Sequence, residues 1–301
     1  MAVVLRGLEW RKLLDLLEHC DWRWWFAGLA VSILVQTLAA IRWAALARPI
    51  GFAFPVTTFL WRFFEGLFFN LCLPSSIGGD VVKAYRLADS TPSRLLAGCT
   101  VLADRLTGLA ALGVLAGTAL TAKEWALDMP ATLALGAVLL VAVLLMFWVV
   151  VGSLDRLLTM IPEQHAARHF IAQLLPYKMQ PSLMMRAVGW SLIIQMGGSV
   201  VVAFIARALG VSLPLSLWFA VVPLVTLAMV VPLSINGVGV REGGLALMLK
   251  PAGVSTDAAV AIGLLWFLAT ILTGLIGGVL FLLDRKPSVA PASVIPPARP
   301  A

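Results

Sequence analysis

Charged residues are scarce in this chain of 301 residues: they make up 12% of it, whereas hydrophobic residues make up 61%. A soluble globular fold needs far more polar surface than this, so the composition excludes that class. Cysteine is also rare, and Cys20, Cys72 and Cys99 have no spacing that indicates a disulfide framework or a metal site. The chain instead has long apolar runs without the alternation of a β-barrel, which predict an all-α polytopic membrane protein.

The apolar runs recur at lengths close to the roughly 20 residues that a membrane-crossing helix needs. We expect full spans near 24–46, 54–73, 94–120, 130–151, 185–209, 216–235 and 258–283. A shorter apolar stretch between Gly243 and Gly253 suits a half-span or re-entrant helix. The prediction is therefore a bundle of seven or eight transmembrane helices with two re-entrant or broken helical segments.

Residues 23–283 are expected to form a single transmembrane domain, preceded by an interfacial amphipathic helix over 1–22 and followed by a disordered, proline-rich tail over 284–301. The only long polar connection, 152–184, divides the domain into halves of about 23–151 and 185–283, which we interpret as a pseudo-repeat. His165 and His169 lie four residues apart in this connection. A third zinc ligand is unclear, so a solvated helix face is the favoured interpretation.

Basic residues give the chain a net charge of +7, and they gather in the N-terminal segment, in 83–94, in 152–184 and in the tail. By the positive-inside rule, these segments are cytoplasmic, including the N-terminus, in a bacterial plasma (inner) membrane. A cytoplasmic C-terminus then requires an even number of crossings, which favours eight. Because topology accounts for the positive charge, we do not expect nucleic acid as a partner.

Two polar segments interrupt the apolar chain 158 positions apart. The segment SIGGDVVK at 76–83 aligns without gaps with SINGVGVR at 234–241, and each follows a proline, Pro74 or Pro232. Paired segments broken by Gly and Pro in two halves of a hydrophobic chain indicate a transporter binding site.

Each broken segment has the parts of an anion site at a helix start, where free N–H groups and the helix dipole favour negative charge. In the first segment, Asp80 is placed to cap a helix that carries Lys83 and Arg86. Taken alone, each segment is more simply a capped loop that breaks a helix, but their recurrence favours a phosphate-type headgroup site. The candidate residues are Pro74, Gly78, Gly79, Asp80, Lys83, Arg86, Ser234, Asn236, Gly237, Gly239, Arg241 and Glu242.

Ionisable side chains inside the predicted spans are further candidates, because each costs about 2.5–3.5 kcal/mol at the centre of a membrane helix. Arg62, Glu65 and Asn70 share one sector of the 54–73 helix. Asp104 and Arg105 are adjacent in the 94–120 helix and are expected to meet partners on other helices. The alternative is a set of structural salt bridges that order the bundle.

Three motifs resemble the signatures of the lysylphosphatidylglycerol synthase transmembrane-region family. They are NLCLPSSIGGDVVK at 70–83, VLADRL at 101–106 and PLSINGVGVRE at 232–242, and the likeness runs from about Trp24 to Leu283. The resemblance implies a bundle with two re-entrant elements around a lipid-headgroup cavity. The family includes the flippase region of the multiple peptide resistance factor, which moves lysyl-phosphatidylglycerol between leaflets. Lys83 departs from the arginine usual in the family, and lysine lacks the bidentate fork of arginine.

The sequence thus predicts a lipid translocase that binds a charged headgroup in a central cavity, with Arg105 and Arg241 on the phosphate. Asp80, Asp104 and Glu242 would orient these cations or contact an amino group. The expected ligand is an anionic or aminoacylated phospholipid or a polyprenyl-linked lipid, with no cofactor, and a lipid-modifying enzyme is a further potential partner. Only an 18-residue tail follows the membrane region, so we do not expect synthesis of the aminoacyl lipid.

Two alternatives stay open. One is a membrane-embedded transferase with Asp104 or Glu242 as base, although the sequence shows neither a metal-binding carboxylate pair nor a nucleophile next to a base. The other is a lipid-binding accessory protein in the biosynthesis of lipids or glycolipids, for example of isoprenoid lipids.

Overall fold

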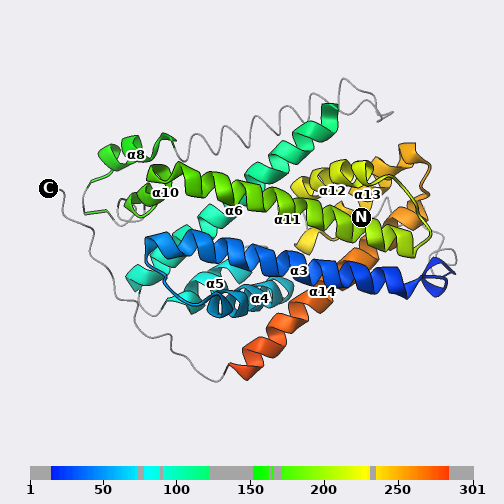
Figure 1. The fold of residues 1–301 in the computed structure, drawn as a ribbon, viewed down its shortest axis with the longest axis horizontal. Helices are drawn as coiled ribbons and strands as arrows, with labels where there is room; N and C mark the ends of the chain where they lie inside the picture. Colours follow the sequence, from blue (N-terminus) through cyan, green and yellow to red (C-terminus); the bar gives the residue numbers. More distant parts are fainter. Residues whose placement is uncertain are drawn as a thin grey trace.

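The computed structural model describes residues 15–73, 78–88, 91–121, 152–162, 164–165, 168, 171–230 and 235–284. Within these ranges all regular structure is helical, as the sequence predicts (Figure 1). Several predictions fall outside the described residues: those for positions 1–14, the span at 130–151, the tail from 285, and Pro74, His169 and Ser234.

The described helices form two series joined by short helices. The first series is α3 (Trp22–Ala47), α4 (Val56–Cys72), α5 (Gly78–Leu87) and α6 (Thr91–Thr121). The second is α11 (Pro181–Ala208), α12 (Leu215–Val230), α13 (Val240–Leu249) and α14 (Thr256–Leu283). The connecting helices are α8 (Leu154–Met160) and α10 (Leu175–Met179), and the 3-10 turns are η1 (Arg48–Ile50), η2 (Ile235–Gly237) and η3 (Lys250–Ala252).

Within the described residues, four helical segments are long and apolar enough to cross a membrane: Trp22–Ile50, Ser93–Gly117, Pro181–Ala208 and Thr256–Leu283. The predicted full spans at 54–73 and 216–235 are shorter. At 1.5 Å per residue, the 17 residues of α4 and the 16 of α12 reach only about 26 and 24 Å, against a hydrocarbon core of about 30 Å. Of the six predicted full spans that fall within the described residues, four are therefore candidate crossings, and the predicted total of seven or eight is not confirmed.

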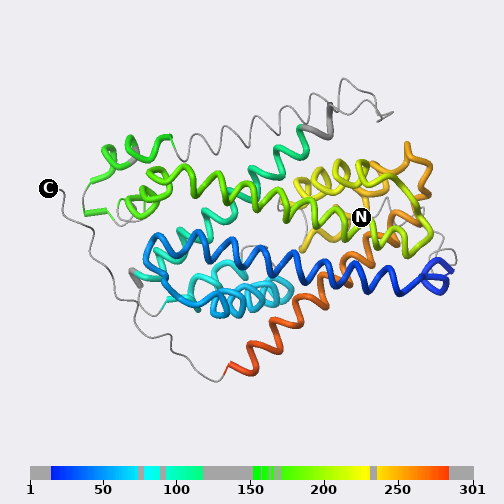
Figure 2. The backbone as a smooth tube through the Cα atoms, in the orientation of Figure 1, coloured from blue at the N-terminus to red at the C-terminus, as the bar shows by residue number. Residues whose placement is uncertain are grey.

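Each short helix forms a hairpin with the helix that follows it: α4 packs against α5, and α12 packs against α13 (Figure 2). In the first hairpin, the Gly79 N–H donates to Asn70 Oδ1 at 2.8 Å. A Cβ on Gly79 would overlap the carbonyl oxygen of Gly66, so only glycine permits this approach. In the second hairpin, Asn236 and Gly237 adopt φ values of 57° and 74° in the left-handed region. The breaks that the sequence marks thus reverse the chain.

The two series pack against each other helix by helix. α3 lies antiparallel to α11, α4 packs on α14, and α12 packs on α6. A core at one end contains Trp25, Trp218 and Leu249, and a second core at the other end contains Trp43 and Phe59. Each hairpin belongs to one of these cores, so the hairpins approach the middle of the molecule from opposite ends (Figure 1).

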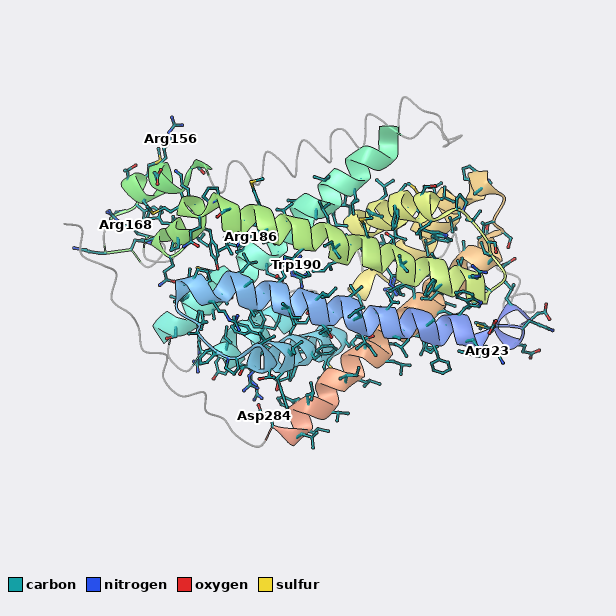
Figure 3. The ribbon with its side chains drawn as sticks, in the orientation of Figure 1. Arg23, Arg156, Arg168, Arg186, Trp190 and Asp284 are labelled. Atoms are coloured by element: carbon teal, nitrogen blue, oxygen red, sulfur yellow. The ribbon has the colours of Figure 1, made fainter. Side chains whose placement is uncertain are left out.

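Two hydrogen bonds show which segments lie at the same end of the molecule. The Asp21 N–H donates to the Ala208 carbonyl at 2.8 Å, and the Tyr177 O–H donates to the Leu46 carbonyl at 2.9 Å. Burial raises the pKa of the Tyr177 phenol, which keeps its proton available for this bond. Figure 3 shows Arg156, Arg168 and Arg186 at one end of the molecule and Arg23 at the other.

The prediction that the N-terminal segment shares a side with 83–94 and 152–184 does not fit this arrangement, because the candidate span α3 runs between Asp21 and Leu46. The physical reason is the α4–α5 hairpin. Counted as a full crossing, residues 54–73 would return the chain to the side where it began. As a hairpin, they leave 83–94 at the end of the molecule that α3 has just reached.

Candidate functional site

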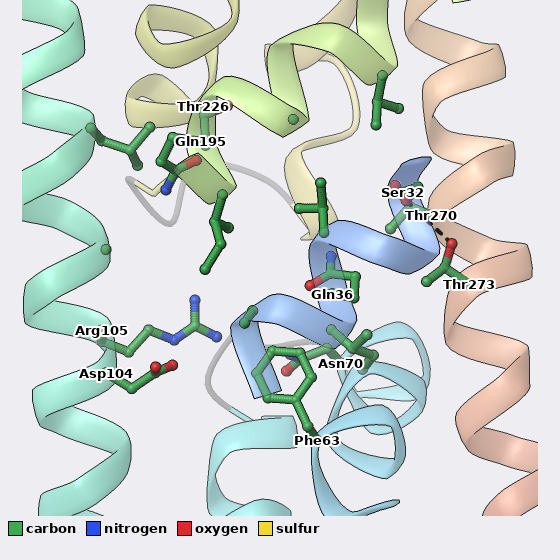
Figure 4. Close-up of a pocket in the computed structure, with 18 of the residues that line it drawn as sticks. Ser32, Gln36, Phe63, Asn70, Asp104, Arg105, Gln195, Thr226, Thr270 and Thr273 are labelled. Carbon is green, nitrogen blue, oxygen red and sulfur yellow. Dashed lines mark hydrogen bonds between the residues drawn. The ribbon is translucent and has the colours of Figure 1, made fainter. Parts of the chain in front are cut away.

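A cavity of about 470 Å³ lies in the middle of the molecule, where the two hairpins meet the long helices (Figure 4). Both helical series contribute to its wall. The polar residues that line it include the charged side chains Arg42, Lys83, Asp104 and Arg105 and the amides Gln36, Asn70, Gln195 and Asn236. Such a concentration of polar groups among apolar helices, more than its volume, makes this cavity the candidate site.

Asp80 organises one side of this cavity. It lies in the first turn of α5, where a carboxylate suits the helix dipole, and its side chain is buried. Lys83 Nζ contacts Asp80 Oδ1 at 2.8 Å, and Arg105 Nε donates to Asp80 Oδ2 at 2.7 Å. Three residues predicted from the sequence thus form one cluster, built by the α4–α5 hairpin lying against α6.

The two cations of this cluster differ in how much of each stays accessible. Lys83 is buried, and its ammonium group also lies 4.6 Å from the centre of the Phe63 ring. The side chain of Arg105 is 50% exposed and points into the open space of the cavity (Figure 4). Because Asp80 engages its Nε edge, the rest of the Arg105 guanidinium is left to meet a ligand.

Arg42 is the charged cavity residue that the sequence analysis did not predict, and the amides of Gln36 and Gln195 were not predicted either. Arg42 Nε and Nη2 both lie 2.9 Å from Asp104 Oδ1, and Arg42 Nη1 donates to Ser191 Oγ at 2.5 Å. The available signal was an arginine inside an apolar span, which needs a partner as much as Asp104 does. With Arg42, the cluster holds three cations against the two carboxylates of Asp80 and Asp104, and its net positive charge favours an anion.

The second broken segment contributes Asn236 to the cavity wall. Arg241 lies behind it, 2% exposed, and its Nη2 donates to the Asn236 carbonyl at 2.8 Å. Its Nε and Nη1 make no hydrogen bond within the described part of the chain, and its guanidinium lies over the rings of Trp266 and Phe267. Arg241 therefore supports the wall of the cavity and is not one of its lining residues.

The remaining residues of that segment hold its turn. Glu242 Oε2 accepts from the Gly239 N–H at 2.5 Å, which caps the start of α13. Gly237 packs against Met229, and a Cβ at position 237 would overlap that methionine. Gly78 and Gly79 have the corresponding role at the start of α5. These residues shape the hairpins around the cavity.

The structure places Arg62, Glu65 and Arg86 elsewhere, although the sequence made them candidates for the same site. They form an ion network with Asp284 at the end of α14 and do not line the central cavity. Asn70, from the same predicted sector, does line it. Across the described residues, no three His, Cys, Asp or Glu side chains gather as a metal site.

The sequence of this chain was compared with known protein families, curated proteins and solved structures, and it matches one family. A family model described as the lysylphosphatidylglycerol synthase TM region matches residues 1–278. No significant match was found to a curated protein or to a solved structure. The motifs at 70–83, 101–106 and 232–242 all lie inside the matched range.

Proposed function

We propose that this chain, which belongs to the family of lysylphosphatidylglycerol synthase transmembrane regions, binds the anionic headgroup of a membrane lipid in its central cavity and moves it between leaflets. The observation that carries the proposal is the cluster of three cations and two carboxylates enclosed among membrane-crossing helices. Charged groups at this depth are costly, and a lipid phosphate would offset their excess positive charge.

The Arg105 guanidinium would contact the phosphate first, because it is the most exposed cation of the cavity. Lys83 would add a second positive charge, and Asp80 would hold both cations in place. The amides of Asn70 and Asn236 offer both donors and acceptors, which suits the glycerol hydroxyls or the amino group of a headgroup. We propose binding and movement without a chemical change in the lipid.

The arrangement of the helices supports a mechanism of alternating exposure. The series α3–α6 and α11–α14 repeat the same order of long, short, ten-residue and long helices. Their first members are antiparallel, and the pairs α4–α14 and α12–α6 correspond to each other under exchange of the two series. This correspondence supports our proposal of an inverted repeat, in which rocking of one half against the other would expose a central site to each side in turn.

The direct test is leaflet transfer of phosphatidylglycerol, aminoacyl-phosphatidylglycerol and a polyprenyl phosphate in proteoliposomes. We expect Arg105→Gln to lower the transfer rate of the accepted lipid at least tenfold, because the amide cannot replace the exposed positive charge. The control is Arg207→Gln, which removes a cation from the end of α11, 4.1 Å from the Trp24 ring and away from the cavity. Wild-type transfer no faster than in protein-free liposomes, or equal transfer by both variants, would contradict the proposal.

The fold also leads us to propose an orientation in a bacterial plasma membrane. Basic residues of the described ranges are more numerous at the end with α8 and α10, and the positive-inside rule makes this end cytoplasmic. They include Arg48, Arg94, Arg156, Arg168, Lys178 and Arg186, against Arg23, Arg207 and Lys250 at the other end, as the positions of their helices show (Figure 1).

Cysteine labelling checks this orientation. The three native cysteines would be replaced, and a single cysteine introduced as Thr159→Cys in α8 or Ala252→Cys in η3, both exposed positions. We expect a membrane-impermeant maleimide to label Ala252→Cys on intact cells and Thr159→Cys only after lysis. The reverse pattern would overturn the orientation, and equal labelling of both in intact cells would contradict their separation by the membrane.

A further inference from the structure

A second hollow lies on the side of the molecule, between α5, α6 and the end of α12. It is a groove of about 750 Å³, and its wall is mostly apolar, with Val81, Leu95, Leu102 and Val230 among the residues that line it. These four side chains are exposed, Val81 to 62%. Single exposed apolar residues are ordinary on a membrane protein, whereas an apolar groove of this size is a site for an apolar ligand.

The groove and the central cavity share part of one wall. Arg105, Thr226 and Val230 line both hollows, and Asp80 lines the groove while it holds Arg105 by its Nε. An anion bound to the exposed guanidinium of Arg105 would therefore lie at the inner end of the groove. The two hollows differ in character, since Arg42, Lys83 and Asp104 line only the central cavity, whereas most of the groove wall is apolar.

We propose that this groove holds an acyl chain of the lipid whose headgroup occupies the central cavity. The inference rests on the proposed function, and it adds the location of the lipid tail. A headgroup can reach the middle of the protein only if its chains stay in an apolar environment, and the groove offers one next to Arg105. Charge complementarity at Arg105 and the shared wall together select a lipid as the occupant.

The groove follows α6 from Arg105 toward Arg94, eleven residues earlier and about 16 Å along the helix axis. Arg94 stacks on the Tyr85 ring at 3.8 Å and donates to the Ala88 carbonyl at 3.3 Å. Arg94 and Tyr85 both line the groove. Its outer end is thus bordered by an arginine already engaged within the protein, which leaves Arg105 as the cation that receives the headgroup.

Gly98 provides a way to fill the groove without disturbing the fold. It lies in α6 on the groove wall, and a Cβ there would meet no atom within 4 Å. The matched control is Gly189 in α11, which has the same open space and lines neither hollow. Gly98→Phe places an aromatic ring in the groove, whereas Gly189→Phe adds the same ring to an exposed helix face.

Native mass spectrometry of the full chain in detergent would measure binding of dioleoyl- and dihexanoyl-phosphatidylglycerol. We expect Gly98→Phe to weaken binding of the dioleoyl lipid at least tenfold and to leave the short-chain lipid unaffected. Gly189→Phe should bind both like the wild type, and Arg105→Gln should lose both. In the wild type, a photoreactive acyl chain should label peptides that contain 95–102 rather than peptides of α11.

Three outcomes overturn the groove proposal while leaving the headgroup site intact. Gly98→Phe could bind the dioleoyl lipid as the wild type does, or lose both lipids equally, while Arg105→Gln still loses both. Labelling of α11 in place of α6 would also overturn it, and this readout does not depend on the folding of a variant. If Arg105→Gln bound both lipids as well as the wild type does, this result would instead contradict the proposed function itself.

Discussion

Glu65→Gln is expected to lower the free energy of unfolding by about 3–5 kcal/mol, the range for removing one partner of a buried ion pair. Glu65 is 0% exposed, and both its oxygens accept from Arg62 and Arg86. Asp284 Oδ2 closes the network, at 2.5 Å from Arg62 and 2.8 Å from Arg86. With glutamine at position 65, a single carboxylate would have to compensate two largely buried arginines.

Reversible unfolding in mixed micelles of dodecylmaltoside and SDS would measure this loss. The control is Asp155→Asn, which breaks the pair of Asp155 with Lys178, where the aspartate side chain is 64% exposed. Exposed pairs contribute about 0–1 kcal/mol, so this variant should unfold nearly like the wild type. Equal stability of Glu65→Gln and Asp155→Asn would show that the network does not hold the α4–α5 hairpin to α14.

Gly277→Ala is expected to cost at least 3 kcal/mol of stability, at or above the usual range of about 1–3 kcal/mol for overpacking, because the obstacle is backbone. A Cβ on Gly277 would overlap the carbonyl group of Phe64 in α4. Gly274 and Gly278 face the same helix, at Leu71 and Phe68. Small residues on this face of α14 let the two helices approach closely, as is common in membrane bundles.

The comparison variant is Gly189→Ala in α11, where an added Cβ meets no atom within 4 Å. Alanine forms helix better than glycine by about 1 kcal/mol, so this substitution should be neutral or stabilising. Thermal unfolding followed by tryptophan fluorescence would rank the two variants. If Gly277→Ala melted at or above the temperature of Gly189→Ala, α4 and α14 would not be in backbone contact.

Much of the candidate site could be predicted from local sequence. Asp80 and Lys83 are predicted from the first broken segment and Arg105 from its charge inside an apolar span, and the structure brings all three into one cluster. The breaks at 74–80 and 232–239 were recognised from glycine and proline, whose backbone properties do not depend on distant contacts. The family membership expected from three motifs is confirmed by the model that matches residues 1–278.

Other parts of the site depend on residues that are far apart in the chain. Glu65 and Arg86 lie about 200 residues before Asp284, and no pattern along the sequence indicates that they meet it. The sector shared by Arg62, Glu65 and Asn70 spans a wide arc, and its two sides face different partners. Glu65 turns to the network at α14, whereas Asn70 turns to the cavity and to Gly79.

By itself, the sequence determined that this protein is helical, that it belongs in a membrane and where its helices break, because hydropathy and backbone freedom are properties of neighbouring residues. The tertiary structure alone decided that α4 and α12 turn back, and that Asp21 and Tyr177 lie at opposite ends of the molecule. It also decided that Asp104 pairs with Arg42 and that a groove opens beside Arg105. These features arise from packing between helices, because the partner of a buried charge is set by which helix faces it.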